Sequence, residues 1–123
     1  MPYEIDYLED EKIVTIKNRG EILFEDLLEQ TKEALELARR KNATLFLSDN
    51  ILLENKAKTF EIYELPKIYD ELGASRNNKL AVLIRKGGHT TKDARFFETI
   101  CLNRGWNVRL FTSYDDAKAW LKE

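Results

Sequence analysis

The first candidate for binding chemistry is the segment at residues 87–92, GGHTTK. This segment follows an apolar run and precedes a helical pattern, so its backbone amides belong to a helix N-terminus, where phosphates and carboxylates bind. The spacing does not match a P-loop, which needs an earlier glycine at a fixed distance from Gly-Lys-Ser/Thr. Thr90 and Asp93 also form a capping pair that would satisfy some of these amides. The segment therefore predicts a turn with a helix cap, and an anion site is the second interpretation.

Nucleophilic and metal chemistry have few candidates in this chain. His89 is the only histidine and Cys101 the only cysteine, which excludes a site of several imidazoles and an internal disulfide. The helical position of Cys101 predicts a small buried residue, whereas a nucleophile needs an exposed thiolate beside a base. The acidic pairs Asp10-Glu11, Glu25-Asp26 and Asp115-Asp116 lie at predicted turns or helix starts, where electrostatics alone explains them. We expect no catalytic residue, no metal and no cofactor.

A second group of candidates lies in the middle of the chain. Asp49 and Asn50 follow a short apolar strand at residues 45–47, at the expected carboxyl end, where open α/β sheets bind ligands. A loop-capping aspartate is the alternative. Thr59 is predicted to cap the following helix. Together the expected ligand or partner surface comprises Asp49, Asn50, Thr59, Arg85, Gly87, Gly88, His89 and Thr90.

Hydrophobic periodicity predicts the elements that must position these residues. Alternation at residues 3–8 and a β-branched run at residues 13–17 predict an antiparallel hairpin that ends at 18–21. An apolar stripe predicts a helix from Phe24 to about Lys41, and residues 51–58 are expected to form a mobile connection. The later elements are a helix begun by Thr59, kinked or divided at Pro66 and ended by Gly73, a strand at 80–84, a helix ended near Gly105, a strand at 106–111 and a helix capped by Ser113.

The predicted order, ββαβαβαβα, indicates one α/β domain over residues 1–123. We expect a mixed, mostly parallel sheet with an N-terminal antiparallel hairpin. The apolar run at 80–84 predicts a strand that is covered on both faces. If consecutive strands are neighbours, right-handed crossovers place most helices on one face and leave part of the other available.

The distribution of charge is more informative than the net charge of −2. Residues 1–36 carry eleven acids and four bases (4 − 11 = −7), and residues 76–110 carry eight bases and two acids (8 − 2 = +6). The basic region could attract an anion or an acidic partner, or the two regions could neutralise each other.

The aromatic residues Phe60, Tyr63 and Tyr69 match core spacing better than a base-stacking platform, so no nucleic-acid partner is expected. No apolar run is long enough for a membrane span, and the N-terminus lacks a signal-peptide pattern. The single cysteine, Cys101, predicts a reducing environment and hence a cytoplasmic protein.

The C-terminal half, KLAVLIRK followed by ARFFETICLNRGWNVRLFTSYDDAKAWLK, resembles the SpoIIAA-like (STAS-type) superfamily, especially its small stand-alone members. With the predicted element order, the resemblance covers essentially the whole chain. It implies a SpoIIAA-like fold and a non-catalytic regulatory module that binds another protein. Relatives with this fold that bind lipids or nucleotides leave a small anionic or amphipathic ligand as the alternative. The residues that carry the likeness are Asn103, Arg104, Gly105, Phe111, Thr112, Ala117, Trp120 and Leu121.

The best understood members of this superfamily are anti-sigma-factor antagonists. The resemblance implies a switch by phosphorylation of a serine within Asp-Ser-Ser-Gly, where the helix after the third strand begins. The equivalent residues 50–59 contain no such motif, and Thr59 is the only hydroxyl residue near the expected place. This departure argues against a phosphorylation switch in the present chain.

Overall fold

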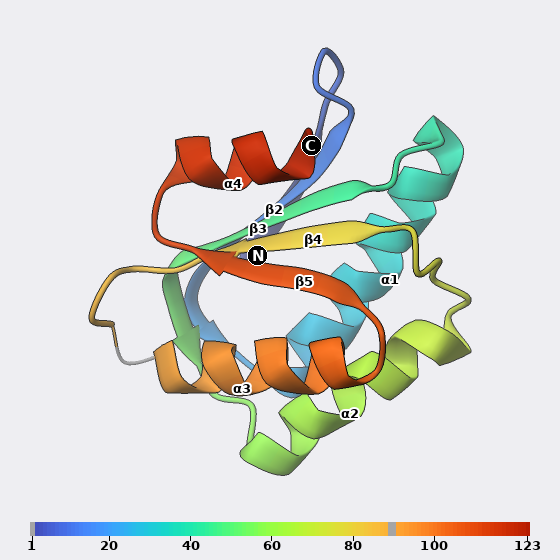
Figure 1. Ribbon diagram of the computed structural model, residues 1–123. Helices are drawn as coiled ribbons and strands as arrows, with labels where there is room; N and C mark the ends of the chain where they lie inside the picture. The colour runs from blue at the N-terminus through green and yellow to red at the C-terminus, as the bar shows by residue number, and fades with distance from the viewer. Residues whose placement is uncertain (1, 89–90) are drawn as a thin grey trace.

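A computed structural model describes residues 2–88 and 91–123, in which strands and helices follow the predicted order (Figure 1). The sheet forms a single layer between two layers of helices. Its members and the helices are β1 (Tyr3–Leu8), β2 (Ile13–Ile22), α1 (Phe24–Lys41), β3 (Leu45–Asn55), α2 (Thr59–Glu71), β4 (Lys79–Leu83), α3 (Thr91–Asn103), β5 (Asn107–Phe111) and α4 (Tyr114–Leu121).

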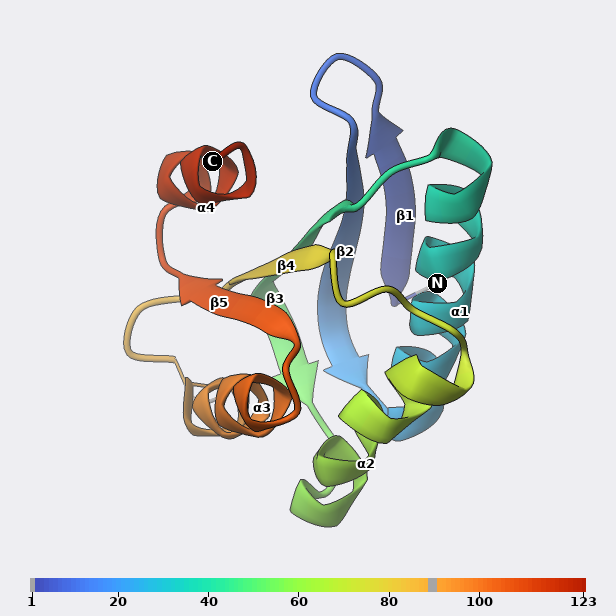
Figure 2. The ribbon, with the colours of Figure 1, turned by 45° about the vertical axis from the view of Figure 1, so that its right-hand side comes forward.

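The sheet has the strand order β1-β2-β3-β4-β5, so consecutive strands are neighbours. Strands β1 and β2 are antiparallel, and every other pair is parallel. Because the crossovers all advance in one direction across the sheet and share one handedness, α1, α2 and α3 cover the same face. Helix α4 lies alone on the opposite face (Figure 2). The predicted α/β fold with its N-terminal hairpin is confirmed.

Adjacent residues of the inner strands enter different helical layers, which explains their unbroken apolar runs. Ile13, Leu47 and Ala81 pack against α4. Their neighbours Val14 and Phe46 pack against α1. On the α3 side lie Val82 of β4 and Ile84, the residue that follows the strand. Ala81, Val82 and Leu83 are 0%, 3% and 2% exposed, so the predicted burial of this strand on both faces is confirmed.

Strands β2 and β3 are longer than the sequence predicted. Residues 18–21 were expected to end the hairpin and residues 51–58 to form a mobile connection, yet Arg19 to Ile22 pair with Leu52 to Asn55. The two segments supply each other's backbone hydrogen bonds, a partnership that local propensity does not reveal. Within this extension Gly20 has a φ of +70°, a left-handed conformation that glycine adopts without steric cost.

Helix α2 differs from the prediction at its start and on its buried face. Lys58 occupies the cap position and Thr59 is the first helical residue, so Thr59 does not cap. The helix continues through the buried Pro66 instead of dividing there. Phe60 and Tyr63, which were expected in the core, are 67% and 45% exposed. The buried stripe instead begins at Ile62 and Leu65 and lies about one residue further round the helix.

Several predicted helix ends are confirmed. Asn42 follows α1 with a φ of 55°, and Gly73 and Gly105 follow α2 and α3 with φ of +73° and +81°. The left-handed conformation at these positions is the common end of a helix. At the start of α4, the Ser113 hydroxyl oxygen accepts a hydrogen bond from the Asp116 backbone N–H at 3.3 Å.

Candidate functional site

A group of buried polar side chains lies between the sheet and α1. Asn18, Gln30 and Ser48 are only 1%, 4% and 7% exposed. Gln30 Nε2 donates to Asn18 Oδ1 at 2.8 Å. Asn50 Oδ1 accepts from both Asn18 Nδ2 and Ser48 Oγ, each at 2.8 Å. Buried polar groups are costly unless they are hydrogen-bonded, and this network satisfies most of that need.

An irregularity in β3 determines which side chains join this group. Lys17 pairs with Asp49, but Arg19 pairs with Leu52, so β3 carries one extra residue between them. Such a bulge reverses the alternation of side chains along a strand. As a result Ser48, Asn50, Leu53 and Asn55 all line the helix-covered side. A regular strand would have placed Leu53 and Asn55 on the opposite face.

Asn55 extends the polar group towards α3. Its Nδ2 donates to Asp93 Oδ2 at 2.8 Å, which joins the end of β3 to the first turn of α3. Its Oδ1 accepts from the Ala57 backbone N–H at 3.0 Å, which shapes the approach to α2. Asp93 was predicted to pair with Thr90, which lies outside the described residues, and the structure pairs it with a residue 38 positions earlier.

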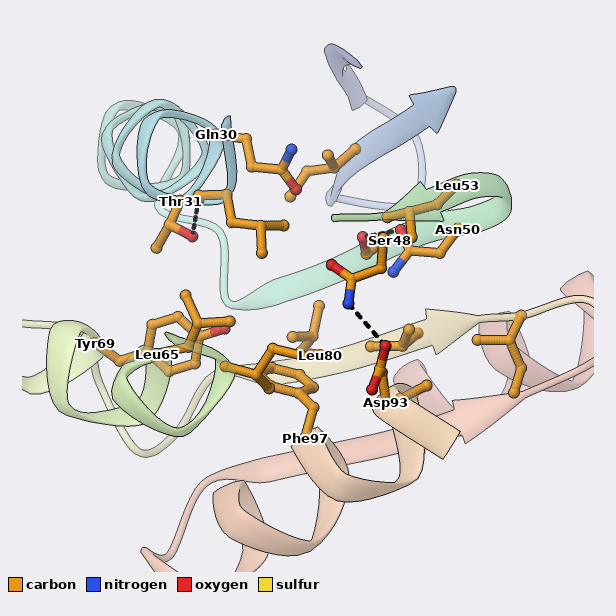
Figure 3. A pocket seen from close by; sticks show the side chains of 17 residues that line it. Gln30, Thr31, Ser48, Asn50, Leu53, Leu65, Tyr69, Leu80, Asp93 and Phe97 are labelled. Carbon is orange, nitrogen blue, oxygen red and sulfur yellow. Dashed lines mark hydrogen bonds between the residues drawn. The ribbon is translucent and has the colours of Figure 1, made fainter. Parts of the chain in front are cut away.

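These polar groups form one end of a cavity of about 120 Å³ between the sheet and α1, α2 and α3. Ser48, Asn50 and Asp93 lie at this end, whereas Tyr69 and Leu65 lie at the other (Figure 3). A second cavity of about 80 Å³ adjoins the first and shares four lining residues with it, including Tyr69. An apolar hollow with a few convergent polar groups is the usual form of a small-molecule site.

The predicted site residues of the central segment separate in the structure. Asn50 lines the cavity. Asp49 is its neighbour on the strand and therefore faces the other side of the sheet, where its Oδ1 accepts from the Ile51 backbone N–H at 3.2 Å. Thr59 is exposed at the start of α2. These three residues do not form one group.

Of the predicted residues in the β4–α3 connection, Arg85, Gly87 and Gly88 lie apart from the cavity lining. Arg85 and Gly87 are exposed, and Gly87 has a φ of +72°. The Thr91 backbone N–H donates to the Gly88 carbonyl at 3.2 Å, so this amide is not free for an anion. His89 and Thr90 lie outside the described residues, and their proposed part in a ligand or partner surface stays a prediction.

Sequence reasoning overlooked Asn18, Gln30 and Asn55, although two of them carried a signal. Asn18 continues the inward alternation of Val14 and Ile16. Gln30 lies within the buried stripe of α1. A polar residue at a position that the period assigns to the core is the informative observation. Asn55 carried no such signal, because its orientation depends on the bulge.

A second feature is an apolar surface on α2. Phe60 and Tyr63 are exposed one turn apart, and Lys58 Nζ and Lys67 Nζ lie 6.0 Å and 5.1 Å from the centres of their rings. We call these four residues the α2 outer face. Cations over aromatic rings are attracted by the ring quadrupole. The outer face therefore combines exposed aromatic area with two lysines, of which Lys67 also pairs with Glu64 at 3.4 Å.

The ionisable groups inside the core are held in their neutral forms. Burial raises the pKa of the Cys101 thiol to about 12, so it is not a ready nucleophile. Burial, and then the nearby Cys101, raise the pKa of Tyr69 well above its usual value.

Within residues 2–88 and 91–123, no group of three or more His, Cys, Asp or Glu side chains could hold a metal ion. In the same residues, no helix has the length and apolar character to cross a membrane.

Solved structures share this architecture. An anti-sigma factor antagonist from Mycobacterium paratuberculosis is 15% identical, with a TM-score of 0.63 over 98% of this chain and 95% of that one. An uncharacterised protein of the DUF3478 family with a SpoIIAA-like fold, from Shewanella loihica, is 21% identical, with a TM-score of 0.61 over 97% and 91%. The anti-sigma factor antagonist SpoIIAA in its unphosphorylated form is 12% identical, with a TM-score of 0.58 over 98% and 97%.

These likenesses show that the chain has the SpoIIAA-like fold over essentially its whole length. No family model matches the chain, and no curated protein matches it in sequence. At such identities the likeness concerns the fold, and a function must be argued from particular residues.

Proposed function

We propose that this chain is a non-catalytic regulatory module that binds another protein through the α2 outer face. The observation that carries the proposal is the exposure of Phe60 and Tyr63, at 67% and 45%. Aromatic residues dominate the energetics of protein interfaces, and exposing two of them on neighbouring turns is unfavourable for a free surface. Two of the structures with the same fold are anti-sigma factor antagonists, which supports the regulatory class by analogy.

The chemistry of the outer face indicates what the partner must offer. The two rings require an apolar pocket, and Lys58, which makes no ion pair among the described residues, favours acidic residues at its rim. The N-terminus of α2 adds the positive end of a helix dipole to the same region. The proposed partner is therefore a protein whose binding surface has an apolar centre and an acidic edge.

The described residues favour binding over catalysis. The Cys101 thiol is buried with its pKa raised, and the Ser48 hydroxyl donates to the Asn50 amide, which is not a base. A hydroxyl or thiol nucleophile needs a neighbouring general base. The Tyr3 hydroxyl does donate to a carboxylate, that of Glu33 at 3.2 Å, but burial and then this carboxylate raise the pKa of Tyr3 to about 12.

Site-specific photo-crosslinking in the native host tests this proposal. A crosslinking amino acid at position 63 should give a discrete adduct with one protein, whereas the same residue at position 114 should not. Tyr114 is the matched control, because it is 42% exposed but lies on α4, on the opposite side of the sheet. With the purified partner, the double variant Phe60→Ala, Tyr63→Ala should bind at least about tenfold more weakly.

The double variant and the two crosslinker variants should retain the unfolding temperature of the parent chain, because exposed side chains contribute little to stability. Adducts formed equally at both positions, or a double variant that binds as tightly as the parent chain, would remove the α2 outer face as the interface.

A further inference from the structure

We infer that the cavity beneath α2 is a binding site for a small neutral molecule with an apolar body and one hydroxyl group. The cavity, of about 120 Å³, approaches the size of an engineered apolar cavity of about 150 Å³ that binds benzene. A body of roughly six carbon atoms therefore fits. The inference concerns the interior of the helical layer and does not depend on the α2 outer face.

The apolar body would be held by side chains from three helices and the sheet. Leu65 of α2, Leu80 of β4 and Phe97 of α3 converge on the cavity from different directions (Figure 3). Burying a ligand of this kind removes apolar surface from water on both sides of the contact, which is the main favourable contribution to such binding. The lining side chains come from elements of one packed fold, and a site that is already formed needs little ordering on binding.

The hydroxyl would be held by Asn50 and Asp93. The Asn50 oxygen accepts from Asn18 and Ser48, which determines the orientation of the amide. Among the described residues, its Nδ2 donates to no partner, and Asp93 uses one carboxylate oxygen for Asn55. A hydroxyl has one donor and two acceptor positions. It can therefore accept from the Asn50 amide, and it can donate to the Asp93 carboxylate.

The same residues discriminate against an anionic ligand. The Asp93 carboxylate lines the polar end of the cavity, so an anionic head would meet a like charge in a partly dehydrated site, where electrostatic interactions are strong. The sequence suggested an anionic or amphipathic ligand as the alternative. Of these two, the proposal keeps the amphipathic ligand in a neutral form and rejects the anionic one.

Amide-resolved NMR titration of the whole chain with phenol and with benzoate tests the inference. Phenol is neutral at neutral pH and benzoate is an anion of similar size. Phenol should shift the amide signals of Asn50, Asp93 and Phe97 progressively to saturation, and it should leave those of α4 unchanged. Benzoate should shift none of them at the same concentration.

Two variants make the assignment specific. Ala94→Leu places a larger side chain in the cavity lining and should weaken phenol binding at least tenfold, which is about 1.4 kcal/mol. Ala119→Leu, at an exposed position of α4, is the matched control and should bind as the parent chain does. Asp93→Asn removes the carboxylate charge and should allow benzoate to shift the same amides.

Three results would overturn the inference. These are a phenol titration without shifts at the cavity residues, equal binding of phenol and benzoate by the parent chain, and a folded Ala94→Leu variant with undiminished phenol affinity. If Ala94→Leu does not fold, the parent titrations and Asp93→Asn decide the matter, because neither changes the volume of the core.

Discussion

Two hydroxyl residues with similar sequence contexts have different roles in this chain. Ser113 and Thr59 each precede a predicted helix and were both expected to cap it. Ser113 does so by accepting from the Asp116 amide. At α2 the cap position belongs to Lys58, and the Glu61 carboxylate instead accepts from the Lys58 backbone N–H at 2.8 Å. Thr59 is left exposed, with no capping role to explain it.

Alanine substitution of Ser113 and of Thr59 should change the free energy of unfolding by different amounts. Ser113→Ala should lower the free energy of unfolding by about 1 kcal/mol, because a helix amide loses its acceptor. Thr59→Ala should change it by less than about 0.5 kcal/mol, as is usual for an exposed position without special contacts. Urea denaturation measures both. A larger loss for Thr59→Ala than for Ser113→Ala would contradict this assignment of the caps.

The bulge in β3 is the element on which the cavity depends. One extra residue between Asp49 and Leu52 changes the side on which every later residue of the strand lies. It turns Leu53 towards the cavity and leaves Leu52 at 54% exposure. Without the bulge, Asn55 would not lie at the polar end of the cavity, and its hydrogen bond to Asp93 of α3 would be lost.

The neighbouring leucines provide a direct test of this bulge. Leu53→Ala should lower the free energy of unfolding by about 1–2 kcal/mol, below the 2–5 kcal/mol typical of a fully buried leucine, because Leu53 is only partly buried. Leu52→Ala, the matched control, should cost less than about 0.5 kcal/mol. A regular strand would give the reverse order, so chemical denaturation of the two variants distinguishes the registers.

At the scale of the whole molecule, the two ends of the chain are joined by charge. Glu11, in the turn of the N-terminal hairpin, contacts Lys118 and Lys122 of the C-terminal segment at 2.6 Å and 2.8 Å. One interpretation of the sequence was that the acidic region 1–36 and the basic region 76–110 neutralise each other. Among the described residues, the ion pairs of the acidic region are made with Lys41, Lys118 and Lys122, so the basic region is not used in this way.

The Glu11 contacts predict a pH dependence of stability. Hydrogen bonds from Lys118, and then from Lys122, lower the pKa of the Glu11 carboxyl below its usual value of 4.5. A lowered pKa in the folded state contributes stability that is complete above the unfolded-state value and is lost as the pH falls through the folded-state value. Glu11→Gln should therefore lose less stability than the parent chain between neutral pH and a pH below 4.5.

Denaturation curves across this pH range measure the difference. Glu9→Gln is the control, because Glu9 also pairs with a lysine but its side chain is 73% exposed, and its acid dependence should follow that of the parent chain. Identical profiles for Glu11→Gln and the parent chain would show that this ion pair contributes nothing to the docking of α4.

The sequence by itself determined the order of the elements, the hairpin, the helix ends at Asn42 and Gly105, and the burial of Ala81 to Leu83. These features follow from local periodicity and backbone preference, which act between residues that are close in the chain. The likeness of the C-terminal half to SpoIIAA-like proteins also predicted the fold that the solved structures share.

Only the tertiary structure decided the length of β3, the exposed face of α2 and the composition of the cavity. Each depends on a partner that is distant in sequence: β2 extends β3, the sheet selects which stripe of α2 is buried, and Asp93 orients Asn55. A bulge has no reliable local signature, yet it reverses the orientation of every residue after it. The cavity is therefore a property of packed elements, because no single segment contains enough of its lining to be recognised alone.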